Sequence, residues 1–414
     1  MNQPAKKRRL PMAPVAPPAL RNLPLADDVR ELDKAARPIL AVWEITLACD
    51  LACRHCGSRA GKARPDELSP EECLDLVDRL ADLGIDEVVL IGGEAYLRDD
   101  WCDIVARIAQ RGMSPIITTG GRGFTKERAL CAKAAGLDSL SVSIDGLGET
   151  HDRQRGVRGS FDSALAALAN ATEAGIPVST NTQINRWSMP ELPQLLELLI
   201  ERGIHSWQIQ LTVAMGRAAD EPDLILQPYD LLELFPMLDT LADRCAEVDV
   251  VLWTGNNIGY FGPVESKLRG NLPLGHRVQC GAGIWGLGIE ADGTIKGCPS
   301  LSTANWTGGN VRDSSLEDIW LRGKAMRYNR GRTTDSLWGF CADCYYADIC
   351  LGGCTWTAES LLGRPGNNPM CHHRALEFEK QGKRERLVQV EQASGIPFDM
   401  GRFEIIVEDI DDHS

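Results

Sequence analysis

The chain of 414 residues is long enough to bury a substantial core, in one large domain or two modest ones. Hydrophobic residues make up 43% and charged residues 25%, as in ordinary globular proteins, and the net charge of −14 argues against a nucleic-acid partner. No apolar run approaches the roughly 20 residues of a membrane span and no signal peptide is recognisable, so we expect a cytoplasmic protein without a membrane partner.

The N-terminal part is expected to be poorly ordered. Residues 1–37 are rich in proline, alanine and charged residues and lack a long periodic segment. They predict a loose lead-in with one helical turn near 26–36. The pattern changes at Ile39, because the apolar run from Ile39 to Thr46 predicts a buried strand.

Three cysteines follow this strand: Cys49, Cys53 and Cys56, with gaps of three and two residues. In a chain with 14 cysteines and no secretory signal, such clustering indicates metal binding rather than disulfides. The loop can supply three ligands to an iron–sulfur cluster, which leaves one iron free for a substrate or cofactor. A zinc site with His55 as fourth ligand is the alternative, although zinc loops usually come as paired Cys-x-x-Cys turns.

The chain then alternates helices and strands. Ser69 begins the first helix with a capping box completed by Glu72, and Gly84 ends it. This alternation predicts βα units and a parallel sheet. Six units are too few for an eight-stranded barrel, so we expect an α/β fold, a partial (β/α)6 TIM-like barrel with its chemistry at the carboxyl ends of the strands. Later strands are expected at 87–91, 115–119, 139–144, 178–182, 207–211 and 248–253. Further helices are expected at about 98–111, 125–135, 161–174 and 228–246. One more helix is expected to begin at a second capping box, residues 188–191.

A Gly-Gly-Glu motif, Gly92 to Glu94, follows the second strand at the same end of the sheet as the cysteine loop. Glycines allow a close approach of the backbone to a ligand, and a carboxylate pairs with an ammonium group. The loop and this motif, in register, resemble the radical S-adenosylmethionine (SAM) enzymes, although the family often has proline where this chain has Ala95. The resemblance implies that Cys49, Cys53 and Cys56 hold a [4Fe–4S] cluster, and that SAM is contacted by Gly92, Gly93, Glu94, Thr119, Ser143 and Arg155. The alternative is that the motif and these polar residues only end strands.

Seven further cysteines follow a Gly/Asn/Pro-rich connection, and Asp292-Gly293 predicts a hairpin between the first two. Paired zinc knuckles are one interpretation. The spacing also resembles the SPASM (twitch-type) extension of radical SAM enzymes, as in mycofactocin and pyrroloquinoline-quinone peptide maturases and anaerobic sulfatase maturases. The resemblance implies two auxiliary [4Fe–4S] clusters, an outer one on Cys341, Cys344, Cys350 and Cys371, and an inner one on Cys280, Cys298 and Cys354.

The inner set is one thiol short of four. Some relatives carry another cysteine near the position of Gly286, and here none is present from 282 to 287. The open iron could take water, another side chain or the substrate, or a distant thiol such as Cys245 could close the site. The other cysteines, Cys73, Cys102, Cys131 and Cys245, lie in helix patterns and are expected to be small buried hydrophobes.

The resemblance implies the activity as well. The enzyme would cleave SAM reductively to a 5′-deoxyadenosyl radical and abstract hydrogen from a ribosomally made peptide or protein, forming a cross-link or thioether or removing a carboxyl group. It would take electrons from a flavodoxin or ferredoxin, and a separate leader-recognition protein is an option. Modification of a small molecule such as a tetrapyrrole or a sugar, and a non-catalytic zinc or electron-transfer protein, are the alternatives. The expected divisions are 1–37, the barrel 38–254, a connection 255–279, the SPASM domain 280–375, and a C-terminal helix and tail 376–414.

Overall fold

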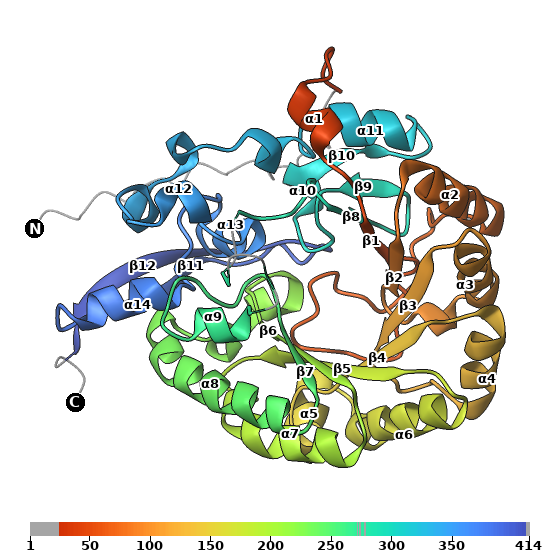
Figure 1. Ribbon diagram of the computed structural model, residues 1–414, viewed down its shortest axis with the longest axis horizontal. Coiled ribbons are helices and arrows are strands. Elements are labelled where there is room, and N and C mark those ends of the chain that lie inside the picture. The colour runs from red at the N-terminus through yellow and green to blue at the C-terminus, as the bar shows by residue number, and fades with distance from the viewer. Residues whose placement is uncertain (1–24, 271, 273–274, 277–278, 411–414) are drawn as a thin grey trace, which may run out of the picture.

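One ten-stranded sheet organises the computed structural model, which describes residues 25–270, 272, 275–276 and 279–410. Its first seven strands lie side by side in chain order, and each is parallel to the next. Figure 1 shows them as a curved wall with helices on the outside. The predicted partial barrel is therefore confirmed. The strands are β1 Leu40–Glu44, β2 Glu87–Ile91, β3 Ser114–Thr119, β4 Ser139–Ser143, β5 Val178–Ile184, β6 Ser206–Leu211 and β7 Val251–Thr254.

The outer helices follow the predicted pattern closely. Helix α2 has the expected capping box, in which the Ser69 hydroxyl accepts from the Glu72 N–H (3.2 Å) and the Glu72 carboxylate accepts from the Ser69 N–H (2.8 Å). Gly84 ends it in the left-handed conformation, with φ +92°. The helices are α2 Pro70–Leu83, α3 Trp101–Gln110, α4 Lys126–Ala135, α6 Ser160–Glu173, α7 Leu192–Glu201 and α8 Leu231–Glu247.

Two local predictions in this region are wrong. The second capping box does not form, because the Ser188 hydroxyl donates to Gln183 O (3.0 Å), and α7 begins only after the 3₁₀ turn η2, Met189–Glu191. The Glu191 carboxylate instead accepts from the Leu147 N–H (2.7 Å). A short helix, α5 Gly148–Arg155, was also missed, since its run of charged residues lacks a clear apolar stripe.

The cysteine-rich region joins the sheet rather than forming a separate layer. Strand β8 (Gly286–Ile289) pairs in parallel with β1, and the predicted hairpin turns it into β9 (Thr294–Lys296). Gly293 adopts φ +86° in that turn, and the Asp292 carboxylate accepts from the Thr294 N–H (2.9 Å). Strand β10 (Thr307–Asn310) completes the sheet next to β9. The barrel and the cysteine-rich region therefore share one continuous scaffold.

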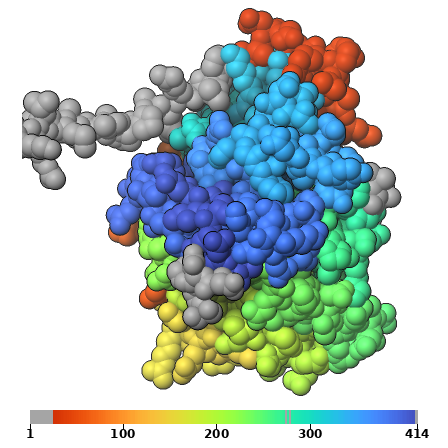
Figure 2. All heavy atoms as spheres, turned by 90° about the vertical axis from the view of Figure 1, so that its left-hand side faces the viewer, coloured from red at the N-terminus to blue at the C-terminus, as the bar shows by residue number. Residues whose placement is uncertain are grey.

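The C-terminal segment is a hairpin, which corrects the predicted helix and tail. After α14 (His372–Glu379) the chain forms β11 (Lys383–Glu391) and β12 (Arg402–Asp409), an antiparallel pair. Glu385 and Leu387, two residues apart on β11, are buried, as is Phe403 on β12. This alternation is the period of two that a strand requires. Figure 2 shows these blue segments lying across one side of the molecule.

The smaller helices are α9 Glu265–Leu268, α10 Thr303–Trp306, α11 Leu316–Arg322, α12 Ala347–Cys350 and α13 Thr355–Leu362.

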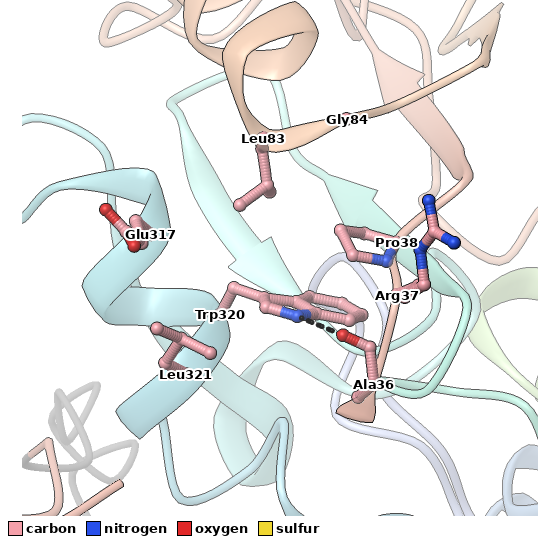
Figure 3. A pocket seen from close by; sticks show the side chains of 8 residues that line it. All are labelled: Ala36, Arg37, Pro38, Leu83, Gly84, Glu317, Trp320 and Leu321. Atoms are coloured by element: carbon pink, nitrogen blue, oxygen red, sulfur yellow. Dashed lines mark hydrogen bonds between the residues drawn. The ribbon is translucent and has the colours of Figure 1, made fainter. Parts of the chain in front are cut away.

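The described end of the N-terminal segment is held firmly. The predicted helical turn is α1, Glu31–Ala35, and the part of the expected loose segment before residue 25 lies outside the described residues. Asp33 is buried and pairs with Arg30 (2.8 Å) and Arg327 (3.0 Å). The Trp320 indole N–H donates to Ala36 O (3.3 Å) beside a shallow pocket of about 200 Å³ (Figure 3). Residues 25–37 therefore belong to the folded body.

In the described part of the chain, no helix combines the length and the hydrophobicity that crossing a bilayer requires.

Candidate functional site

A cavity of about 1000 Å³ lies inside the curved sheet. Alternate residues of each strand face it, because side chains along a strand point to opposite sides. The wall formed by β1–β3 is mostly aliphatic, and the wall formed by β4–β6 carries hydroxyl and amide groups. The aliphatic residues are Leu40, Val42, Val89, Ile91 and Ile116, and Glu87, Thr118 and Thr119 are the polar residues of that wall. The polar residues of β4–β6 are Ser139, Ser141, Ser143, Ser179, Thr180, Asn181, Gln183, Ser206, Gln208 and Gln210.

The loop with Cys49, Cys53 and Cys56 lies at the carboxyl end of β1, and all three cysteines line the cavity. Backbone hydrogen bonds hold the loop in place: the Cys49 N–H donates to Gly61 O (3.2 Å), and Cys56 O accepts from the Arg217 N–H (3.0 Å). Each sulfur also accepts an N–H. The donors are Leu51 N to Cys49 Sγ (3.4 Å), Arg155 Nη1 to Cys53 Sγ (3.7 Å) and Ala60 N to Cys56 Sγ (3.4 Å).

The two glycines of the Gly-Gly-Glu motif serve the cysteine loop. A Cβ on Gly92 would lie 2.2 Å from Thr46 O, and one on Gly93 would lie 1.9 Å from Ala48 O. The Gly93 N–H donates to Thr46 O (2.7 Å). The close approach that these glycines allow is therefore between two backbone segments of the chain and not, as their motif predicts, between the backbone and the ligand.

The carboxylate of Glu94 is buried at the floor of this site. It accepts hydrogen bonds from the Thr119 hydroxyl (2.5 Å) and the Gly120 N–H (2.7 Å). Burial raises its pKa to about 7 despite these two bonds. A carboxylate has further lone pairs to offer, so it can still accept from an ammonium group placed in the cavity.

Ser143 and Arg155 are both buried, and each has a polar partner of its own. Arg155 Nη2 pairs with Asp145 at 2.5 Å, and the Ser143 hydroxyl donates to Asn181 Oδ1 (3.0 Å). Burial raises the pKa of the Cys53 thiol to about 11, although the Arg155 cation opposes the shift. All six residues assigned to SAM line the cavity. Sequence reasoning missed Asn181, because an asparagine inside a strand carries no motif.

The zinc site with His55 as fourth ligand does not form among the described residues. Tetrahedral zinc, with bonds of about 2.0–2.3 Å, needs its ligand atoms within roughly 4 Å of one another. Among the described His, Cys, Asp and Glu side chains, only Cys49, Asp50 and Glu94 bring three such atoms within 4.8 Å of one another. His55 instead directs Nε2 toward Asp145 (3.6 Å), and burial lowers its pKa to about 4. The wider spread of the loop thiols suits an iron–sulfur cube, which is larger than a single ion.

The seven C-terminal thiols include two sets of close neighbours. Burial and the neighbouring Cys280 and Cys354 raise the pKa of Cys298 to about 12. Burial and the neighbouring Cys371, Cys341 and Cys344 raise the pKa of Cys350. The groups differ in one respect: Cys280, Cys298 and Cys354 line the large cavity, whereas the other four thiols are not part of its wall.

The remaining cysteines lie away from both groups. Cys73 and Cys245 are buried in α2 and α8, as expected, so Cys245 is not placed to complete the inner set. Cys102 and Cys131 form a disulfide between α3 and α4, and Cys131 is exposed, so the prediction of two buried free thiols is wrong for this pair. The two helix patterns gave no sign that these thiols meet, since the pairing depends on how the helices pack.

The C-terminal hairpin reaches back to the cysteine loop. The Phe398 N–H donates to Gly57 O (3.0 Å), and Arg59 Nε donates to the Asp399 carboxylate (2.8 Å). Lys296 Nζ lies 3.6 Å from the centre of the Phe398 ring. Residues 396–400 thus connect the loop to the strand before Cys298, a contact that the sequence did not indicate.

Comparison with known proteins agrees with this geometry. A model of the radical SAM superfamily matches residues 43–201, and a model of the SPASM iron–sulfur cluster-binding domain matches residues 280–345. The AdoMet-dependent heme synthase of Nitratidesulfovibrio vulgaris is 27% identical over 357 residues, 81% of this chain and 92% of that protein. The mycofactocin maturase MftC of Mycolicibacterium smegmatis is 30% identical over 340 residues, 81% of this chain and 82% of that protein.

Solved structures share the fold at lower identity. Streptococcus suis SuiB bound to S-adenosylmethionine aligns with TM-score 0.63 and 18% identity, covering 81% of this chain and 76% of that one. The enzyme anSMEcpe with bound AdoMet aligns with TM-score 0.65 and 15% identity, covering 83% and 96%. The chain belongs to the radical SAM superfamily and carries a SPASM domain, and it is a radical SAM enzyme that uses a [4Fe–4S] cluster and S-adenosylmethionine.

Proposed function

We propose that this enzyme modifies a peptide, using three [4Fe–4S] clusters. Cys49, Cys53 and Cys56 would hold the SAM-binding cluster, Cys280, Cys298 and Cys354 the inner auxiliary one, and the four thiols outside the cavity wall the outer one. When bound, the first cluster supplies the electron that cleaves SAM and generates the radical that abstracts hydrogen. The protein itself would bind SAM and the peptide, orient them and keep water away from the reacting carbon.

The SAM contacts follow from charge and position. The buried Glu94 carboxylate would accept the methionine ammonium, and Thr119, which donates to that carboxylate, would fix its orientation. Arg155 would offer its guanidinium to the methionine carboxylate, while Asp145 holds it in place (2.5 Å). Gly92 and Gly93 would contribute indirectly, by letting the cysteine loop lie against the end of β2.

The cavity wall is the observation that favours a peptide. Ten hydroxyl or amide side chains on β4–β6 can donate to and accept from peptide groups, and the opposite wall offers aliphatic contacts. Two of the cavity's three arginines are engaged within the protein, Arg155 with Asp145 and Arg269 with backbone carbonyls including Gly255 O (2.9 Å). A tetrapyrrole with several carboxylates would need more uncommitted cations than this wall presents. SuiB, which shares the fold, has been crystallised with its precursor peptide SuiA.

Isotope transfer tests the proposal directly. Reconstituted, reduced enzyme would be given SAM and, separately, deuterated short peptides encoded beside its gene and a deuterated coproporphyrin-type tetrapyrrole. A peptide substrate should pass deuterium to 5′-deoxyadenosine and change in mass, and the tetrapyrrole should do neither. Deuterium transfer from the tetrapyrrole alone would refute the peptide assignment.

Tetrapyrrole modification is the second candidate, because heme synthases and peptide maturases occur at similar identity among the relatives. The aliphatic wall of β1–β3 could accept a macrocycle face. The same experiment decides between the two substrates.

A further inference from the structure

Arg217 lines the cavity, and no described carboxylate lies within ion-pair distance of its guanidinium. It lies in the 3₁₀ turn η3 (Gly216–Asp220), directly after β6. Its backbone N–H donates to Cys56 O (3.0 Å), and its Nη2 donates to Ala60 O (3.0 Å). Its Nε is buried without a hydrogen-bond partner, and within the described residues Arg217 takes part in no ion pair. A partly buried guanidinium with a buried, unused donor favours binding of an anion.

The nearby acidic groups are already occupied. The Asp220 carboxylate accepts from Arg59 through both oxygens (2.6 and 2.9 Å), and Asp145 pairs with Arg155 at 2.5 Å. His55, which also lines the cavity, is a base rather than an acid and cannot compensate the charge. Because Arg59 engages both oxygens of Asp220, the unused N–H donors of Arg217 remain available to a ligand.

Neighbouring contacts place Arg217 between the first cysteine loop and the inner auxiliary set. The Trp356 indole N–H donates to Met215 Sδ (3.3 Å), which joins the residue two before Arg217 to the residue two after Cys354. Gly216 holds the turn against the loop, because its φ is +57° and a Cβ there would lie 2.3 Å from Gly57 O. These contacts hold Arg217 in the lining of the cavity, which also includes both thiol sets.

We propose that Arg217 binds a carboxylate group of the substrate and so holds the substrate between the first cluster and the inner auxiliary cluster. The planar guanidinium fork matches a carboxylate through two parallel N–H···O bonds. The inference builds on the proposed function in placing the substrate in this cavity, but it applies to any substrate that bears a carboxylate. A second source of the same chemistry is the methionine carboxylate of SAM, and the experiment separates the two.

Propionate is the probe, and propionamide is its uncharged counterpart. In reduced, reconstituted enzyme loaded with SAM, a paramagnetic cluster broadens the proton resonances of a ligand bound nearby. Propionate should be broadened at least tenfold more than propionamide. Arg217→Gln should abolish that difference, and Arg217→Lys should restore part of it. Arg54→Gln is the matched control, since Arg54 lies in the adjacent cysteine loop but pairs with Glu221 (2.9 Å) and is not part of the cavity wall.

A second measurement compares the binding of SAM with that of its decarboxylated analogue, which lacks the methionine carboxylate. We expect Arg217→Gln to leave the ratio of the two dissociation constants unchanged. If the ratio collapses toward one, Arg217 binds SAM and the assignment to the substrate is wrong. Propionate broadening that survives in Arg217→Gln would overturn the carboxylate site as well. The iron content of both variants, and the signal of Arg217→Lys, show whether a loss of binding comes from misfolding.

Failure of the peptide proposal is a separate outcome. If no peptide transfers deuterium but propionate is still distinguished from propionamide through Arg217, the peptide assignment falls and the carboxylate site stands. If a peptide is modified and Arg217→Gln alters neither propionate broadening nor the KM for that peptide, the carboxylate site falls alone.

Discussion

The two cavity-facing thiol sets contain three cysteines each, whereas the set away from the cavity contains four. Cys49, Cys53 and Cys56 come from one short loop, and Cys280, Cys298 and Cys354 come from segments far apart in the sequence, yet both sets line the same wall. A cluster with four thiolates has every iron closed, and a cluster with three keeps one iron open. If each set holds the cluster proposed for it, the two sets that reach the cavity are the two that leave one iron without a thiolate, although they are built in different ways.

The largest expected effect tests the set on the loop. Replacing Cys49, Cys53 and Cys56 together with alanine should remove about a third of the iron, if three [4Fe–4S] clusters are present, and all SAM cleavage. Iron analysis and 5′-deoxyadenosine release measure the two quantities. SAM cleavage that persists in this variant would mean that the open iron lies elsewhere.

The second test compares the inner set with the outer one. Cys280→Ala should abolish product formation while part of the SAM cleavage continues, because the first site is intact. In the background without the three loop cysteines, electron paramagnetic resonance should show one auxiliary signal that shifts when a small thiol is added and one that does not. Cys341→Ala should remove the insensitive signal. Two signals that both ignore the thiol would indicate that the inner cluster is closed.

The third test concerns SAM binding on the loop side. Glu94→Gln removes a charge-assisted bond worth about 1.5–3 kcal/mol, so SAM should bind roughly ten- to a hundredfold more weakly. Iron content should not change, since Glu94 is not proposed as a cluster ligand. Equilibrium dialysis with labelled SAM measures the effect. Equal affinity in the variant and the parent would leave Glu94 with a structural role only.

The fourth test asks how far the loop depends on distant segments. Asp399→Ala removes the buried partner of Arg59 (2.8 Å) and should cost about 1–3 kcal/mol locally. Iron should then leave the first site severalfold faster in the presence of a chelator, while the outer set is unaffected. Asp220→Ala is the control, because its side chain is half exposed and Arg59 would keep Asp399. Equal rates in both variants would show that the hairpin contact does not stabilise the loop.

The smallest effect is expected at Glu44 on β1, the strand at which the barrel meets the cysteine-rich region. Burial and the nearby Glu290 raise the pKa of Glu44 from 4.5 to about 8, although Arg64 (3.7 Å) and Lys296 oppose the shift. The folded state therefore holds this proton more tightly than the unfolded state, so stability falls as pH rises from about 4.5 to 8.

Glu44→Gln removes this titration. The thermal midpoint of the parent should fall by a few degrees more than that of Glu44→Gln between pH 6 and pH 8.5. Parallel curves for the two proteins would mean that Glu44 is ionised throughout that range.

The sequence alone determined the parts of this protein that depend on local chemistry. The alternation of strands and helices, the capping box at Ser69 and the turn at Gly293 are set by residues close in the chain, and each formed where it was expected. The expected positions of the loop cysteines and of Glu94 at the carboxyl ends of strands follow from the parallel order of the sheet. The two groups of C-terminal thiols could be expected only through a resemblance to a family.

Only the tertiary structure decided what depends on distant neighbours. The pairing of β8 with β1, the disulfide of Cys102 with Cys131, and the contact of Asp399 with Arg59 each join segments that no local pattern relates. The C-terminal hairpin was missed because a two-stranded hairpin becomes stable only when one of its faces packs against the rest of the protein. The sequence likewise could not predict the unused Nε donor of Arg217, since whether a buried polar group has a partner depends on all the residues that fold around it.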